Sequence, residues 1–171
     1  MKPSVGWALV GMQFGVLSAL LVFPAGDGWP RNWIVGAGAA ALLMAGVLTA
    51  VVASFRLGTS LTPLPIPKNN GTLARDGIYR TVRHPIYTGV LVAAAGVVVW
   101  GGSPAHVIAW LALWGVLSAK VHFEEAMLRE KYLEYHDYQK TSGRFLPRWS
   151  SLFPLKKPAH PRVLNRSSSE V

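Results

Sequence analysis

The sequence predicts an all-α integral membrane protein of about four transmembrane helices, followed by a C-terminal amphipathic helix at the cytoplasmic surface. Two observations support this prediction. The 171 residues are 51% hydrophobic, and the apolar residues are gathered in long blocks rather than in the short periodic runs of a soluble core. Lys and Arg are concentrated between two of these blocks and after the last one, as the positive-inside rule requires.

Four apolar blocks can cross a bilayer, at residues 5–23, 33–55, 86–102 and 105–119. A helix needs about 20 apolar residues to span the hydrocarbon, so the last two blocks are short. Only Ser103 and Pro104 separate these two blocks, which together predict a helical hairpin. Lys2 precedes the first block, as in a signal peptide, but the length of the block and the lack of an A-x-A cleavage site favour a membrane span.

Small residues recur at helical spacing within the apolar blocks. Such residues let membrane helices approach one another closely, so they predict a compact bundle. The positions are Gly36 and Ala40, then Gly89, Ala93 and Gly96, and finally Ala112, Gly115 and Ala119.

The distribution of charge predicts the topology. Both termini and residues 56–85 carry most of the basic side chains and are expected to face the cytoplasm, whereas residues 24–32 and 103–104 face away. A net charge of +9 would also suit nucleic-acid binding, but basic residues beside the membrane already account for it. We therefore expect membrane lipids, and not nucleic acid, as partners.

Residues 1–153 are expected to form a single domain, and residues 154–171 a flexible basic tail. Residues 57–77 are rich in Pro, Gly and Asn, which is typical of a long loop with a functional role or of disorder. Residues 122–144 contain strong helix formers with apolar side chains at helical spacing, and Gly143 marks a helix end. This segment predicts the amphipathic helix, continuing from the fourth span along the cytoplasmic interface.

The start of the third block has the features of an anion-binding site. Pro85 suits the first position of a helix, where its missing N–H would have no partner, so His84 lies at the N-terminus of that helix. Free backbone N–H groups there, next to Arg83 and His84, favour a negatively charged ligand. Tyr87 follows one turn later. The alternative is an interfacial polar cap with no ligand.

Five of the eight acidic residues lie between Glu124 and Asp137. Glu124 and Glu125 come soon after the last apolar block, at a depth where carboxylates are usually functional. Neighbouring residues point about 100° apart on a helix, so only one of them can face a given pocket. The alternative for Glu125 is an ion pair with Arg129 on a solvated face.

Several classes of chemistry find no support in the sequence. There is no Cys, which excludes disulfides, thiolate metal sites and cysteine nucleophiles. The His and Glu residues near the two clusters lack the HExxH and H-x3-H spacings, so no metal is expected. There is also no P-loop, no GxGxxG motif and no G-x-S-x-G elbow.

The basic and acidic clusters should lie side by side at the cytoplasmic end of the hairpin. Packed helices are about 8–10 Å apart, so the start of the third block and the end of the fourth are neighbours. A pocket with cations on one wall and carboxylates on the other suits a zwitterion. The carboxylate of such a ligand would bind Arg83, His84 or the helix terminus, and its ammonium or hydroxyl groups would bind Glu124.

The run DGIYRTVRHPIYTGVL, residues 76–91, resembles the RHPxYxG signature of the isoprenylcysteine carboxyl methyltransferase and phospholipid methyltransferase group. The run FEEAMLREKYLEYHDYQKTSGRFLPRW, residues 123–149, is similar to the EE motif, tyrosine-rich helix and final Arg-x-x-Pro of that group. The two motifs occur in order on either side of a hairpin, and the resemblance covers residues 59–149. The first two spans match only in being apolar.

The resemblance implies a methyltransferase that binds S-adenosylmethionine at the cytoplasmic side and acts on a lipophilic or small apolar acceptor, which enters from the bilayer. Among the acidic residues, Glu124 is the preferred cofactor contact. Prenylcysteine enzymes of the group have an Arg, associated with the substrate carboxylate, at the position of Lys120. Lysine keeps the charge but loses bidentate recognition, so the acceptor stays open between a carboxylate, an amine and similar groups. The cofactor-binding positions implied are Gly71, Thr72, Leu73, Ala74, Tyr79, Arg83, His84, Pro85, Ile86, Tyr87, Gly89, Glu124 and Glu125.

Two other functions are compatible with parts of the sequence. Membrane sterol reductases carry a related Arg-His-Pro motif and use NADPH, but they have many more spans than four. A non-enzymatic helical membrane protein would use Arg83 and Glu124 only as interfacial anchors.

Overall fold

The computed structural model describes residues 3–62, 64, 66 and 72–148. Within these residues the protein is all-helical, with no strand. The predicted tail at residues 154–171 and the predicted site residue Gly71 lie outside the described residues. The helices are α1 (Pro3–Val22), α2 (Trp33–Leu57), η1 (Gly58–Ser60), η2 (Gly77–Arg80), α3 (Pro85–Gly101), α4 (Pro104–Lys131) and α5 (Tyr135–Thr141).

Local sequence explains where the long helices begin and end. The side chain of Asn32 caps α2 by accepting a hydrogen bond of 3.0 Å from the backbone N–H of Val35. Pro85 and Pro104 open α3 and α4, where a missing N–H costs nothing. Gly102 ends α3 in the left-handed conformation, with φ of 59°, that glycine adopts without strain.

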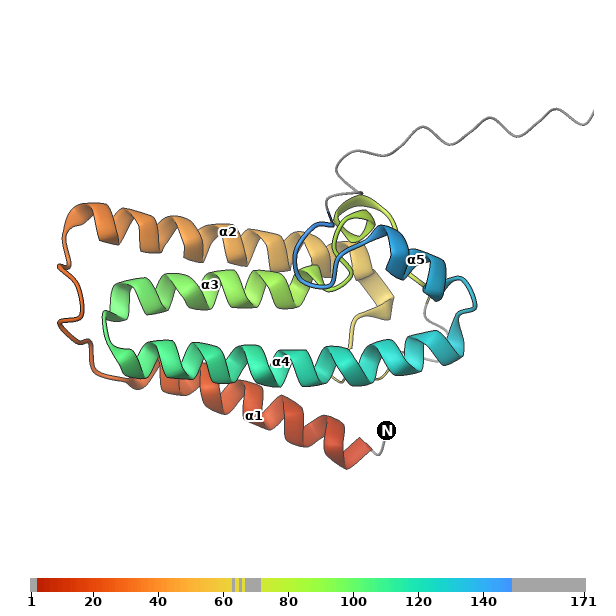
Figure 1. Cartoon of the computed structure of the whole chain (residues 1–171), viewed down its shortest axis with the longest axis horizontal. Helices are drawn as coiled ribbons and strands as arrows, with labels where there is room; N and C mark the ends of the chain where they lie inside the picture. Colours follow the sequence, from red (N-terminus) through yellow and green to blue (C-terminus); the bar gives the residue numbers. More distant parts are fainter. Residues whose placement is uncertain (1–2, 63, 65, 67–71, 149–171) are drawn as a thin grey trace, which may run out of the picture.

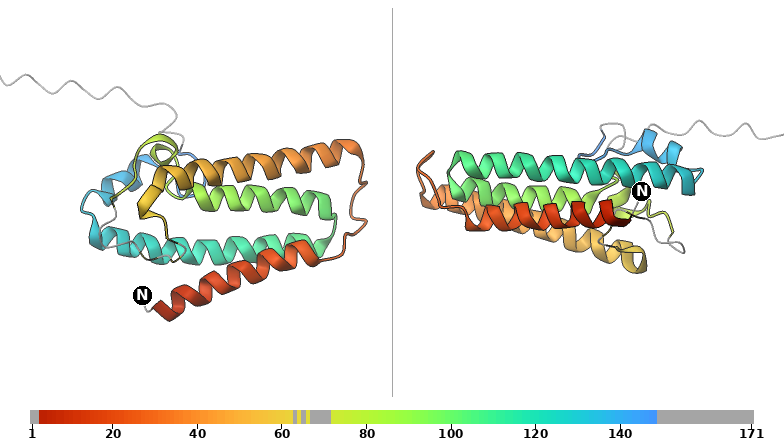
Figure 2. Two further views of the ribbon diagram at one scale, coloured as in Figure 1. Left: turned by 180° about the vertical axis from the view of Figure 1, so that it is seen from behind. Right: turned by 90° about the horizontal axis from the view of Figure 1, so that it is seen from below.

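Three described helices, α1, α2 and α4, are long and apolar enough to cross a membrane. The fourth predicted span corresponds to α3, which has only 17 residues. Figure 1 shows α3 lying between α2 and α4, with α1 on the far side of α4. The two views in Figure 2 also show α1, α2, α3 and α4 running alongside one another in one bundle.

Small residues allow α2 and α3 to touch through their backbones. A Cβ atom added to Gly89 would lie 2.6 Å from the carbonyl oxygen of Gly46, and one added to Gly96 would lie 2.6 Å from that of Ala39. The predicted small face on the third helix is therefore confirmed, and it faces α2. On the predicted face of the fourth helix, Gly115 makes no such close approach, because nothing lies within 4 Å of a Cβ added to it.

The start of α1, η2 and α5 lie at one end of the bundle, here called the site end (Figure 1). The connection between α1 and α2 closes the opposite end. Its backbone N–H groups at Gly26 and Gly28 donate to the carbonyls of Gly101 and Gly102. The indole N–H of Trp29 donates to the carbonyl of Val99 at 2.7 Å. Hydrogen bonds to the end of α3 therefore hold this connection in place.

The predicted amphipathic helix over residues 122–144 is divided in two. Helix α4 continues without a break to Lys131, and the backbone becomes extended at Tyr132, with φ of −125° and ψ of 113°. The chain then turns back across the site end as the seven-residue α5. Tyr135 and Tyr138 of α5 are buried.

Candidate active site

The segment after α5 is bound to the loop that precedes α3. Val82 and Gly143 form a parallel bridge, in which the N–H of Arg83 donates to the carbonyl of Gly143 at 2.8 Å. The N–H of His84 donates to the carbonyl of Arg144, and the hydroxyl of Thr88 donates to the carbonyl of Phe145 at 2.7 Å. Residues 142–145 therefore cover the start of α3 and accept hydrogen bonds from the backbone N–H groups of Arg83 and His84.

Glu125 joins three segments in a buried ion cluster. Its side chain is only 2% exposed, and one carboxylate oxygen accepts hydrogen bonds from Arg83 at 2.9 Å and from His84 at 3.3 Å. The other oxygen accepts from Arg144 at 2.9 Å and Gln139 at 3.2 Å. The expected pair with Arg129 on a solvated face is therefore wrong, because Glu125 points into the bundle.

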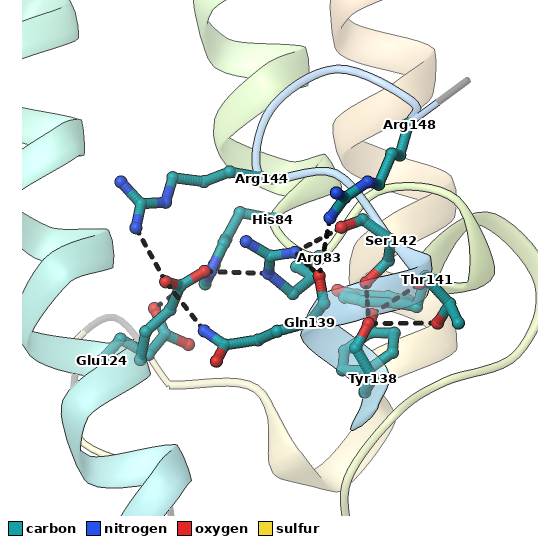
Figure 3. Close-up of polar contacts among 11 residues, drawn as sticks. Arg83, His84, Glu124, Tyr138, Gln139, Thr141, Ser142, Arg144 and Arg148 are labelled. Atoms are coloured by element: carbon teal, nitrogen blue, oxygen red, sulfur yellow. Dashed lines mark hydrogen bonds and ion pairs between the residues drawn. The ribbon is translucent and has the colours of Figure 1, made fainter. Parts of the chain in front are cut away.

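Arg83 completes this cluster from the loop before α3. Besides Glu125, its guanidinium donates to the backbone carbonyls of Gln139 and Ser142. Figure 3 shows Arg83, His84 and Arg144 converging there with the α5 segment. All of these contacts are within the protein, so Arg83 fixes the fold of the site end.

His84 lies between the two acidic residues of α4. Its Nε2 contacts Glu125, and its Nδ1 is 3.8 Å from a carboxylate oxygen of Glu124. The imidazole is buried and stacks on the Tyr87 ring at a centroid distance of 5.8 Å. The contacts with Glu125 and Tyr87 thus fix the orientation of the imidazole ring, and the contact with Glu125 links His84 to the ion cluster.

Glu124 and Lys120 lie one turn apart on α4. The hydroxyl of Tyr87 donates to Glu124 at 3.2 Å. The Lys120 ammonium donates to the Gln13 side chain of α1 at 2.7 Å and lies 5.2 Å from the Tyr87 ring centroid. Lys120 is only 3% exposed, so its charge is held within the bundle.

These side chains open onto a cavity of about 390 Å³ at the site end. Its walls come from α1, α2, α3, α4, α5 and the loop before α3. The lining residues are Val10, Gln13, Phe14, Leu57, Ser60, Leu61, Thr62, Thr72, Leu73, Ala74, Tyr79, His84, Pro85, Ile86, Tyr87, Lys120, Glu124, Leu128, Tyr132, Tyr135 and Tyr138.

Most of the predicted site residues line this cavity: Thr72, Leu73, Ala74, Tyr79, His84, Pro85, Ile86, Tyr87, Lys120 and Glu124. Three predicted residues do not. Arg83 and Glu125 are engaged in the ion cluster, and Gly89 contacts α2. The structure therefore distinguishes Glu124, which faces the cavity, from Glu125, which supports it.

Sequence reasoning missed the contribution of α1 and α5 to the cavity. Gln13 could have been recognised as a candidate site residue, because it and Ser18 are the only polar side chains in the apolar block at residues 5–23. Tyr135 and Tyr138 were placed on an amphipathic helix, and no local pattern shows that the chain turns back.

Buried phenols form one wall of the cavity. Burial, together with the nearby Glu124 carboxylate, raises the pKa of Tyr79 far above its ordinary value. Burial raises the pKa of Tyr138 to about 12. Both phenols are therefore neutral at physiological pH and act as hydrogen-bond donors. Among the described residues, no group of three His, Asp or Glu side chains could hold a metal ion.

Comparison with known proteins places the chain among membrane methyltransferases. The sequence model of the family described as Phospholipid methyltransferase matches residues 34–134, which is more than half of the chain. "Probable protein-S-isoprenylcysteine O-methyltransferase" of Oryza sativa subsp. japonica is 29% identical over 146 residues, covering 81% of this chain and 75% of that protein. "Protein-S-isoprenylcysteine O-methyltransferase A" of Arabidopsis thaliana is 27% identical over 127 residues, covering 70% of this chain and 62% of that protein.

Proposed function

Because the chain belongs to the phospholipid methyltransferase family and is a membrane methyltransferase, we propose that it transfers a methyl group from S-adenosylmethionine to a lipophilic acceptor. The observation that carries this proposal is the cavity at the site end. It brings His84 and Glu124 together with an otherwise largely apolar lining.

The cavity suits this cofactor in size and in chemistry. Its volume of about 390 Å³ is within the range of small-molecule sites, roughly 300–1,000 Å³. Glu124 supplies a carboxylate for the ammonium group, and the half-buried position of this carboxylate strengthens such a contact. Leu57, Leu73 and Leu128 offer apolar surface to the less polar part of the molecule.

S-adenosylmethionine supplies a methyl group already activated by a sulfonium, so the protein needs mainly to align it with the acceptor and exclude water. Glu124 binds and orients the polar end of the cofactor. Glu125 holds the His84 ring in place from the opposite side, at 3.3 Å. The apolar wall keeps water away from the reacting atoms.

We place the site end at the cytoplasmic face. Basic residues of the described chain gather there in the loop before α3 and at the end of α4, as the positive-inside rule requires. In this arrangement the shorter α3 forms a fourth span, and its brevity places His84 near the edge of the hydrocarbon.

The acceptor is best supported as a lipophilic molecule with an anionic oxygen. Lys120 lines the cavity beside Val10 and Phe14 of α1, so a cation lies next to apolar surface. An ammonium attracts a carboxylate and repels a protonated amine. Methyl transfer to a carboxylate oxygen needs no general base, because that oxygen carries no proton. The plant relatives are named as O-methyltransferases of isoprenylcysteine, which fits an acceptor of this class.

Replacing Lys120 by methionine should reduce methylation of the acceptor. We expect the rate at low acceptor concentration to fall roughly 10- to 100-fold, the loss of one hydrogen bond to a charged group. The assay supplies methyl-labelled S-adenosylmethionine and a membrane extract, and the labelled lipid is then identified. Lys120→Arg is the matched control and should keep most of the rate. A wild-type rate in Lys120→Met would remove this residue from the acceptor site.

Calorimetry on the purified protein tests the function itself. We expect S-adenosylmethionine to bind with one site per chain and NADPH not to bind. Binding of NADPH alone would instead favour a reductase that shares the Arg-His-Pro motif. If neither molecule binds, the proposed function is wrong and a non-enzymatic role is favoured.

A further inference from the structure

Tyr135 is a buried residue of the cavity wall. It begins α5, is only 1% exposed, and lines the cavity. Its ring packs edge-on against Tyr138, with centroids 5.8 Å apart. A phenylalanine would fill the same space, so packing alone does not explain the hydroxyl group.

The hydroxyl groups of the neighbouring tyrosines all have partners within the protein. Tyr79 donates to the carbonyl of Ala53 at 3.2 Å, and Tyr138 donates to the carbonyl of Tyr79 at 2.5 Å. Tyr87 donates to Glu124 at 3.2 Å. These three phenols therefore stabilise the cavity wall without help from a ligand.

The hydroxyl of Tyr135 differs from them. Within the part of the chain that the structure describes, it is the one buried side-chain polar atom with no hydrogen-bond partner. Native proteins rarely leave such a group unsatisfied, because burying it without a partner is unfavourable. A partner is therefore expected from a molecule that enters the cavity.

We propose that the Tyr135 hydroxyl donates a hydrogen bond to an oxygen atom of bound S-adenosylmethionine. This inference rests on the proposed function, which supplies the cofactor. The position of Tyr135 supports it, since this residue lines the same cavity as His84 and Glu124. Burial, followed by the negative charge of Glu125, raises the pKa of Tyr135, so its hydroxyl keeps its proton and acts as a donor.

The test compares Tyr135→Phe with Tyr138→Phe, two single-atom deletions in the same helix. Tyr138→Phe removes a hydrogen bond made within the protein, so it should lower the melting temperature of the cofactor-free protein. Tyr135→Phe removes an unsatisfied hydroxyl, so it should leave that temperature unchanged or raise it. The same variant should weaken S-adenosylmethionine binding about 3- to 10-fold by calorimetry.

Each result decides something definite. If Tyr135→Phe lowers the cofactor-free melting temperature as much as Tyr138→Phe does, the hydroxyl is already satisfied and the inference is wrong. If wild-type protein binds the cofactor and Tyr135→Phe binds it equally well, the inference also fails while the proposed function stands. If wild-type protein does not bind S-adenosylmethionine, the proposed function fails, and the melting temperatures still show whether the hydroxyl lacks a partner.

Discussion

Replacing Glu125 by alanine is expected to lower the free energy of unfolding by about 3–5 kcal/mol, the usual cost of breaking a buried ion pair. The reason is that Arg83 and Glu125 are both nearly inaccessible, with side-chain exposures of 10% and 2%. Removal of the carboxylate leaves the Arg83 charge buried without its counter-ion. It also releases His84 and the Arg144 segment, which Glu125 holds against the start of α3. Denaturant unfolding in detergent measures the change.

Two variants accompany this measurement. Glu125→Gln keeps the shape and removes the charge, so its loss of stability should be smaller than that of alanine. Glu130→Ala changes an exposed acidic residue of the same helix and should alter the unfolding free energy by no more than about 0.5 kcal/mol. Equal stability of Glu125→Ala and Glu130→Ala would show that the ion cluster does not hold the site end together.

Replacing Glu124 by alanine is expected to weaken S-adenosylmethionine binding by about 10- to 100-fold, with much less effect on folding. Glu124 lines the cavity, and its side chain is 27% exposed, whereas that of Glu125 is 2% exposed. The charge therefore stabilises a ligand more than it stabilises the bundle. Calorimetry gives the affinity, and thermal unfolding of the cofactor-free variant shows whether the fold is retained.

The adjacent residue provides the contrast for this experiment. Glu124→Ala should lose affinity while remaining folded, and Glu125→Ala should lose stability first. Glu130→Ala should bind the cofactor like the wild type. An unchanged dissociation constant in a folded Glu124→Ala protein would assign the polar end of the cofactor to other cavity residues.

The apolar blocks, the hairpin and the start of α3 could be predicted from the sequence because local chemistry decides them. A long apolar run has to satisfy its backbone in a helix when it crosses lipid, and Pro85 suits only the first turn. Glycines at helical spacing correctly indicated the face of α3 that packs on α2. The same reasoning failed for Gly115, since small residues permit close packing without requiring it.

The roles of the charged residues could not be read from local pattern. Glu124 and Glu125 differ by one position, and a rotation of about 100° decides which of them faces the cavity and which faces Arg83. The charge and position of Arg83 predicted that it binds an anionic ligand, but its anionic partner is Glu125 of α4. Gln13 reaches the cavity only because α1 packs beside α4.

By itself, the sequence determined an all-helical membrane protein with basic and acidic clusters near one end of a hairpin. Those features depend on hydrophobicity and charge, which act locally. The tertiary structure alone decided that the segment after α5 covers the start of α3, that Glu125 supports the site while Glu124 faces the cavity, and that the hydroxyl of Tyr135 has no partner among the described residues. Each of these depends on contacts between segments far apart in the chain, which no local pattern specifies.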